Sequence, residues 1–203
     1  MKLTWNGHSC FTIETAQGTV VTDPFLDGVV PGYGNVRAEA EAVFCSHGHR
    51  DHCAKELITL TGKECGVGVE EIHTFHDPEE GKLRGTNIIH IFSAEGLKVA
   101  HMGDLGCELT AEQLEKLQGL DAMLVPVGGF YTIDAAQAKA LAEAVKPRVV
   151  VPMHYRGENF GYEVIGPVED YLALCDNVVK YEGNSMELTK DTPAQTAVLT
   201  YLG

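Results

Sequence analysis

The stretch His47-Gly48-His49-Arg50-Asp51-His52 decides the interpretation of this chain, because it places four potential metal ligands within six residues. It directly follows an apolar run at residues 42–45, which predicts a short buried strand, and a glycine allows the chain to turn at its end. A helix would spread the four ligands over different faces, so only a tight loop can bring them together. Imidazoles and a carboxylate without a thiolate suit zinc, iron or manganese. The stretch therefore predicts a metal centre at the carboxyl edge of a strand.

His-X-His-X-Asp-His is the signature of the metallo-β-lactamase fold, and the chain resembles that superfamily. Further positions that the fold requires occur in the expected order, each after an apolar, strand-like run: Asp23, His76, Asp104 and His154. The resemblance spans residues 23–154. It implies an α/β protein with a four-layer αββα sandwich, in which two mixed sheets are flanked by helices.

The resemblance also implies a role for each of these residues. The family's first metal position corresponds to His47, His49 and His76, and its second to Asp51, His52 and His154. Asp104 would bridge the two metals, and Asp23 would orient the metal loop without binding. The implied cofactors are two divalent ions, zinc first and manganese or iron as alternatives. The implied reaction is hydrolysis by a metal-bridging hydroxide, with Asp51 as the catalytic residue that steers it.

Within the superfamily, the chain is most similar to the branch of small metal-dependent hydrolases that includes L-ascorbate 6-phosphate lactonase. Three segments carry this narrower resemblance: residues 4–11, 96–106 and 126–132. His49 favours hydrolysis over redox chemistry, because flavodiiron oxidoreductases of this fold carry glutamate there. The sequence contains no G-x-S-x-G motif, which would indicate a serine nucleophile.

Five other residues are candidates for contact with the substrate. His8 follows the first predicted strand near the mouth of the site, where it could bind substrate or act as a catalytic acid, or be a structural histidine. Arg84 and Asn87 could contact an anionic substrate, although a hairpin turn with a surface arginine explains them almost as well. Tyr155 and Arg156 directly follow a predicted ligand and are expected to line the pocket.

Length and composition predict one domain over residues 1–203. A hydrophobic content of 44% suffices for a substantial core, and no linker or low-complexity segment divides the chain. We expect no signal peptide and no membrane span, because neither end nor middle has a long apolar run. Six cysteines without CxxC pairs indicate reduced thiols and a cytoplasmic location.

The formal net charge of −14 argues against nucleic acid as a partner, because phosphate backbones are met by clustered lysine and arginine. The expected partner is a small-molecule substrate, with a homo-oligomer left open. The function predicted is hydrolysis of a small, anionic ester, lactone or phosphodiester. The alternatives are a phosphodiesterase or nuclease of the same fold, and a metal-binding sensor with little turnover.

The periodicity predicts a strand-rich first half followed by alternating strands and helices, typical of mixed α/β proteins. Strands are expected at residues 2–6, 10–15, 19–22, 85–93, 96–101, 122–127, 148–153, 178–181, 185–188 and 196–201. Helices are expected at 51–61, from Thr110, at 133–145 and from about 166 to 175, with an irregular loop at 27–35.

Overall fold

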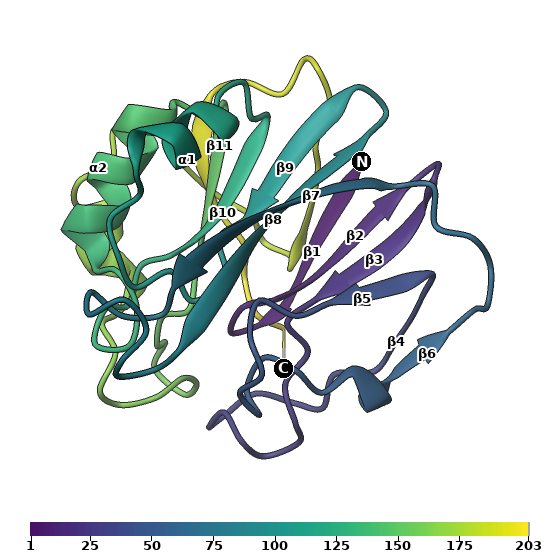
Figure 1. The fold of residues 1–203 in the computed structure, drawn as a ribbon, viewed down its shortest axis with the longest axis horizontal. Coiled ribbons are helices and arrows are strands. Elements are labelled where there is room, and N and C mark those ends of the chain that lie inside the picture. The colour runs from purple at the N-terminus through teal and green to yellow at the C-terminus, as the bar shows by residue number, and fades with distance from the viewer. Residues whose placement is uncertain (203) are drawn as a thin grey trace.

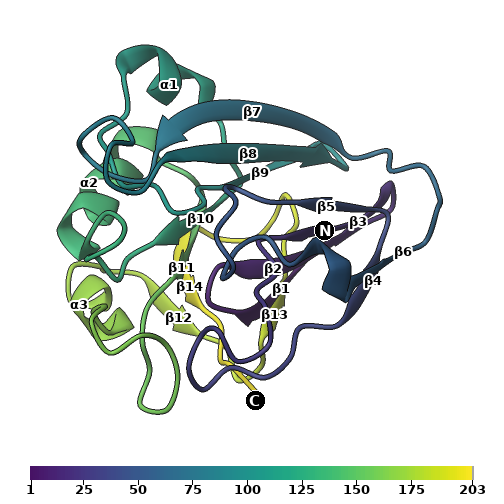
Figure 2. The same ribbon diagram turned by 60° about the horizontal axis from the view of Figure 1, so that its bottom comes forward.

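The computed structural model describes residues 1–202, and two β-sheets face each other in it with the helices on one outer side (Figures 1 and 2). The first sheet has the strand order β13-β1-β2-β3-β5. Its strands are β1 (Lys2–Gly7), β2 (Cys10–Thr15), β3 (Gly18–Thr22), β5 (Ala42–Phe44) and β13 (Ser185–Glu187). Antiparallel pairing of β1 with β2 and of β2 with β3, and parallel pairing of β3 with β5, give β1, β3 and β5 one direction.

The second sheet has seven strands in the order β12-β14-β11-β10-β9-β8-β7. They are β7 (Gly68–Phe75), β8 (Thr86–Ala94), β9 (Leu97–His101), β10 (Ala122–Pro126), β11 (Val149–Met153), β12 (Val178–Lys180) and β14 (Gln195–Val198). The neighbouring strands β9, β10, β11, β14 and β12 pair in parallel in that order. Strand β8 is antiparallel to both β7 and β9. Every residue of β10 and β11 is buried, as expected for parallel strands covered on both faces.

Three helices lie on the outer side of the seven-stranded sheet (Figures 1 and 2). They are α1 (Ala111–Lys116), α2 (Ala135–Val145) and α3 (Val168–Leu172). Thr110 begins α1 through a capping box with Gln113, as predicted, and Asp134 begins α2 through a capping box with Gln137. Within residues 1–202, no helix is both long enough and apolar enough to span a bilayer.

The hydrophobic core lies between the two sheets. Alternate residues of β1, Leu3 and Trp5, are almost fully buried, while their neighbours are partly exposed, as the period of a strand requires. Phe11 and Ile13 of β2 extend the same buried layer, and Ile91 of β8 belongs to the core cluster. The α/β class and the facing sheets predicted from the sequence are confirmed by this architecture.

The helix predicted for residues 51–61 is wrong. The chain makes a turn, a single 3-10 turn η1 (Lys55–Leu57) and then a strand β6 (Ile58–Leu60), which pairs in parallel with β4 (Ala38–Ala40). Two consecutive β-branched residues, Ile58 and Thr59, favour this extended conformation. The loop predicted at residues 27–35 contains no helix or strand, as expected.

Candidate metal centre

Six strands end at one edge of the facing sheets, and each of them is followed by a residue of the candidate site. His8, Asp23, His76 and His154 come directly after β1, β3, β7 and β11, whereas the 47–52 segment follows β5 after two residues and Asp104 follows β9 after two residues. The three strands in each sheet share one direction, so their carboxyl ends meet. This edge is where α/β proteins commonly bind their ligands.

Backbone conformation helps to turn these side chains into the site. His8, Asp23 and His154 have positive φ values of 52°, 43° and 52°. Non-glycine residues seldom adopt this left-handed conformation, and it costs free energy that the surrounding structure must supply. The three residues share this conformation because each must reverse direction immediately after a strand.

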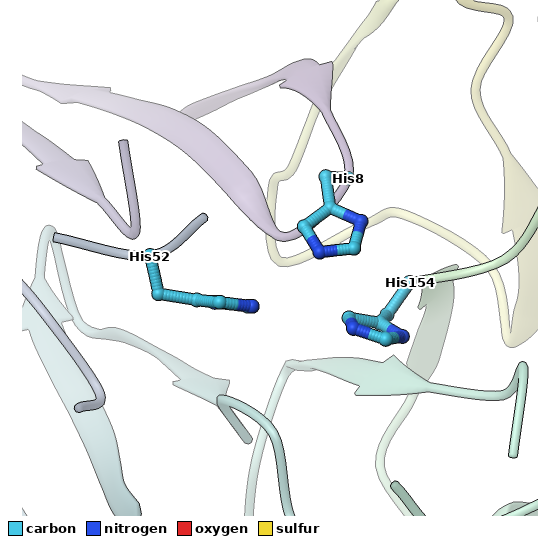
Figure 3. Close-up of side chains that lie close together, drawn as sticks. All are labelled: His8, His52 and His154. Atoms are coloured by element: carbon cyan, nitrogen blue, oxygen red, sulfur yellow. The ribbon is translucent and has the colours of Figure 1, made fainter. Parts of the chain in front are cut away.

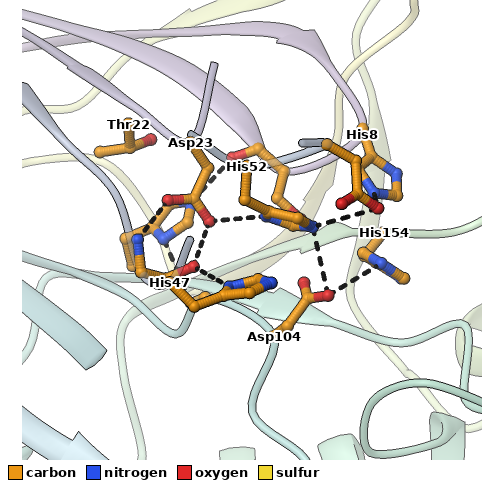
Figure 4. Close-up of polar contacts among 12 residues, drawn as sticks. His8, Thr22, Asp23, His47, His52, Asp104 and His154 are labelled. Atoms are coloured by element: carbon orange, nitrogen blue, oxygen red, sulfur yellow. Dashed lines mark hydrogen bonds and ion pairs between the residues drawn. The ribbon is translucent and has the colours of Figure 1, made fainter. Parts of the chain in front are cut away.

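Asp104 lies at the centre of the site. Its Oδ2 atom is 3.2 Å from Nε2 of His52 and 3.3 Å from Nε2 of His154 (Figure 4). The same atom is 3.4 Å from Nε2 of His76, while the Oδ1 atom has no hydrogen-bond partner among the described residues. Burial opposes ionisation, but His154 and His52 hold the pKa of the Asp104 carboxyl well below its usual range. Ligands about 2.1 Å from a shared zinc ion lie roughly 3.4 Å apart, so these separations suit a bridging carboxylate.

Two groups of three histidines flank Asp104. His47, His49 and His76 offer nitrogen atoms that all lie within 4.8 Å of one another, and His8, His52 and His154 form a second such group. Burial lowers the pKa of His8 and of His47 to about 3, so both rings are neutral near pH 7 and offer lone pairs.

Unpaired buried atoms test whether a metal fits here. Buried ring nitrogens of five of the six histidines lack a hydrogen-bond partner in the described part of the chain: His8, His47, His52, His76 and His154. Such atoms are costly unless something binds them. The set of imidazoles and carboxylates therefore fits divalent ions such as zinc, manganese or iron.

Asp23 is placed to orient the metal loop. Its carboxylate accepts hydrogen bonds from Ser46 N at 2.6 Å and Ser46 Oγ at 2.5 Å, and it lies 2.9 Å from Nδ1 of His52 (Figure 4). Burial opposes its charge, but His101 and His52 lower the pKa of Asp23 to about 2. A carboxylate on Nδ1 directs Nε2 of His52 into the site, which is how residues behind metal ligands tune a centre.

Asp51 stands between the second group of histidines and the pocket. Its Oδ2 atom is 3.9 Å from Nε2 of His52 and accepts a hydrogen bond of 3.2 Å from the Tyr162 hydroxyl. Burial and the neighbouring Asp51 raise the pKa of Tyr162, so its hydroxyl stays protonated at neutral pH. Asp51 thus lies beside both the second group of histidines and the pocket.

A pocket of about 290 Å³ opens onto this centre. It is lined by His49, Asp51, His76, Arg84, Asp104, Tyr131, His154 and Tyr162. The Arg84 guanidinium lies over the Tyr131 ring, 5.7 Å from its centroid, in a cation–π arrangement. Among these lining residues, Arg84 is the one arginine, and there is no lysine.

Three predicted substrate residues lie elsewhere. Asn87 is fully buried and donates to Thr74 Oγ1 and the Met102 carbonyl, while its Oδ1 accepts the Asp104 amide at 2.9 Å. It positions Asp104 and does not line the pocket. The expectation that Tyr155 and Arg156 line the metal pocket is wrong, because both line a separate pocket of about 430 Å³ beside Trp5.

The prediction for His8 also needs correction. Its side chain is fully buried and is absent from the pocket lining, so it does not lie at the mouth of the site. Tyr131 and Tyr162 also line the pocket and were not predicted from the sequence. Tyr131 follows β10 within a segment that carried the family resemblance, whereas Tyr162 sits in a glycine-rich loop that gives no signal.

Comparison with known proteins identifies the family. A family model described as a beta-lactamase superfamily domain matches residues 2–154. The chain belongs to the metallo-β-lactamase superfamily. A protein from Thermotoga maritima, described as a zinc-dependent hydrolase of this superfamily, has a crystal structure with a TM-score of 0.78 and 34% identity, covering 98% of this chain and 97% of that one.

Other members of the superfamily are similar over most of their length. A metal-dependent hydrolase of Archaeoglobus fulgidus is 29% identical over 197 residues, covering 76% of this chain and 83% of the relative. One from a Geobacillus strain is 28% identical over 196 residues, covering 76% and 85%. Together with the ligand cluster, these relatives establish the chain as a metal-dependent hydrolase of the metallo-β-lactamase superfamily.

Proposed function

We propose that this enzyme hydrolyses a small, anionic ester, lactone or phosphodiester at a dinuclear metal centre, with zinc as the first candidate metal. The observation that carries the proposal is Asp104 Oδ2, which lies within 3.2–3.4 Å of Nε2 atoms from three histidines on three different segments. A group of three histidines lies on either side of this carboxylate. The two groups would give two metal positions, each with three imidazole ligands available.

The residues that would hold the ions are those that the family resemblance marks. His47, His49 and His76 would hold the first ion, Asp51, His52 and His154 the second, and Asp104 would contact both. Bound divalent ions supply a Lewis acid that acidifies water and polarises a carbonyl or phosphoryl oxygen. Asp51 faces the pocket and accepts a hydrogen bond from Tyr162, so its carboxylate is placed to orient the attacking water.

The pocket supports an anionic substrate. The Arg84 guanidinium can donate two parallel hydrogen bonds to a carboxylate or phosphate, and the Tyr131 ring restricts its position. The Tyr162 hydroxyl is a further donor beside the centre. A volume of about 290 Å³ suits a small molecule and not a polymer strand.

The two alternatives receive less support. A sensor with little turnover would have a centre sealed from solvent, whereas His49 is exposed and lines an open pocket. A nuclease would need a cationic surface, whereas the chain carries a net charge of −14.

The test is metal content measured by plasma mass spectrometry on protein purified without added metal, together with turnover of chromogenic lactone, ester and bis-phosphate substrates. We expect close to two ions per chain and activity that a chelator removes. Substitution Asp104→Ala or His49→Ala should abolish turnover, whereas His73→Ala, at a side chain that is 75% exposed, should leave it unchanged. Metal-free protein that takes up no ion on reconstitution would refute the proposal, and the preferred substrate would separate lactonase from phosphodiesterase.

A further inference from the structure

His8 is held beside the metal centre by a tightly built turn. Its carbonyl accepts hydrogen bonds from the Trp5 indole at 3.0 Å and from the His154 amide at 3.2 Å. Gly7 before it has a φ of 108°, and a Cβ atom there would lie 2.5 Å from the Tyr33 ring. The turn therefore accepts only glycine at that position and fixes the direction of the His8 side chain.

The His8 ring lacks any hydrogen bond. The side chain is fully buried, and neither Nδ1 nor Nε2 has a partner among residues 1–202. The nearest acidic group is Asp51, whose Oδ2 atom lies 3.7 Å from Nε2, which is too far for a hydrogen bond. A ring with two unpaired polar atoms is costly at this depth, and a structural role gives no reason for choosing histidine here.

The ring faces the two other histidines of the second group. Its centroid lies 4.1 Å from that of His154 and 5.0 Å from that of His52, and one nitrogen from each of the three lies within 4.8 Å of the others (Figure 3). Asp51, which is in reach of the same space, lies on the side of the pocket. Because His8 is absent from the pocket lining, it cannot reach a substrate there.

We propose that His8 is a direct metal ligand, which completes a three-histidine position with His52 and His154. This inference deepens the proposed function and rests on its assumption of two bound ions. The second position would then offer five protein ligands: His8, Asp51, His52, Asp104 and His154. The first position offers four and includes the exposed His49, so it keeps more room for water or substrate. A closed position is typical of a structural ion and an open one of catalysis, so we expect the position that includes His8 to bind its ion first.

The test uses His8→Asn, because asparagine tolerates the left-handed conformation but is a shorter and poorer ligand. The matched control is His90→Asn, a buried histidine that packs against Phe44 and Phe92. Metal-free protein is titrated with Co²⁺, and the two affinities are measured by competition with a chromophoric chelator. We expect the tighter binding event to weaken by more than about 100-fold in His8→Asn, beyond the roughly 10- to 100-fold effect of residues behind the ligands, and to stay unchanged in His90→Asn. Substitution His49→Ala should weaken only the other event.

Thermal unfolding separates a ligand from a structural residue. A ligand role leaves the Tm of metal-free His8→Asn near that of the unsubstituted protein and removes most of the increase caused by Co²⁺. A structural role lowers the Tm of the metal-free and of the Co²⁺-loaded protein equally, and this result would overturn the inference. Two unchanged Co²⁺ affinities would overturn it as well. The dinuclear centre would stand in either case. Protein that binds no Co²⁺ at all would instead refute the proposed function.

A second measurement needs no variant at position 8. Fully cobalt-loaded protein, with ¹⁵N-labelled histidine, should show six paramagnetically shifted imidazole N–H signals in its NMR spectrum, one from each residue of the two histidine groups. Five signals, with the missing signal assigned to His8, would exclude His8 from the coordination sphere.

Discussion

At the scale of single residues, the site is shaped by side chains that hold the ligands in place. Asp23 connects the metal loop to β3 through Ser46 and His52, and Asn87 connects Asp104 to β8 and to the Met102 carbonyl. Both side chains are fully buried and hydrogen-bonded, so they fix ligand positions before a metal arrives. Arg84 differs, because its side chain is partly exposed and free to meet a substrate.

For Arg84→Gln we expect KM for an anionic substrate to rise by roughly 10- to 100-fold, because a hydrogen bond to a charged group contributes about 1.5–3 kcal/mol. The kcat value and the metal content should change little, since Arg84 is not a ligand. Steady-state kinetics with an anionic substrate and its neutral analogue checks this. Equal effects on both substrates would show that Arg84 does not recognise charge.

At the scale of elements, strand ends supply the ligands and loops supply the pocket. The loop from residue 77 to 85, which carries Arg84, is organised around one carboxylate. Asp77 accepts backbone N–H groups of Glu79, Gly81, Leu83 and Arg84 at 2.7–3.1 Å. Burial opposes its ionisation, but these donors outweigh burial and lower the pKa of Asp77.

For Asp77→Asn we expect a disordered loop, a raised KM and an unchanged metal content, because the charge and one acceptor oxygen are lost while His76 remains. The native pKa is lowered, so Asp77 stabilises the fold at pH values above its unfolded pKa of about 3.9. This contribution is lost as the pH falls through the native pKa. Chemical denaturation at several pH values should therefore show a difference between the two proteins at pH 7 that shrinks in acid. A difference that does not depend on pH would contradict this role.

At the scale of the whole molecule, the metal centre joins the two sheets. His47 and His52 come from the loop after β5 of the five-stranded sheet, while Asp104 and His154 follow strands of the seven-stranded sheet. Ions that bind all of them cross-link the two layers. They also partner buried atoms that lack hydrogen bonds among the described residues.

Removal of metal should therefore lower the stability of the whole protein. A ligand present at 100 times its Kd stabilises the folded state by about 2.7 kcal/mol, so chelation should lower Tm by several degrees. Scanning calorimetry with and without chelator, at matched ionic strength, measures the change. Substitution His73→Ala should keep the full response, whereas Asp104→Ala should lose most of it. Equal Tm values with and without metal would show that the ions do not bridge the sheets.

The sequence by itself determined the fold class and the seven candidate ligands that the family resemblance marked. Each of these ligands lies at or just after the carboxyl end of a strand, and strand ends are readable from local apolar runs. The predicted helix at residues 51–61 failed because pairing of β6 with β4 is a contact between segments distant in sequence, which local periodicity does not record.

Only the tertiary structure decided which side chains surround the centre. Tyr162 is 111 residues from Asp51, the partner of its hydroxyl, and His8 is 146 positions from His154, against which its ring packs. Tyr155 and Arg156 directly follow a ligand and yet line another pocket. A strand fixes where its end lies, but which loops meet there depends on how two sheets pack, and no spacing within the chain encodes that packing.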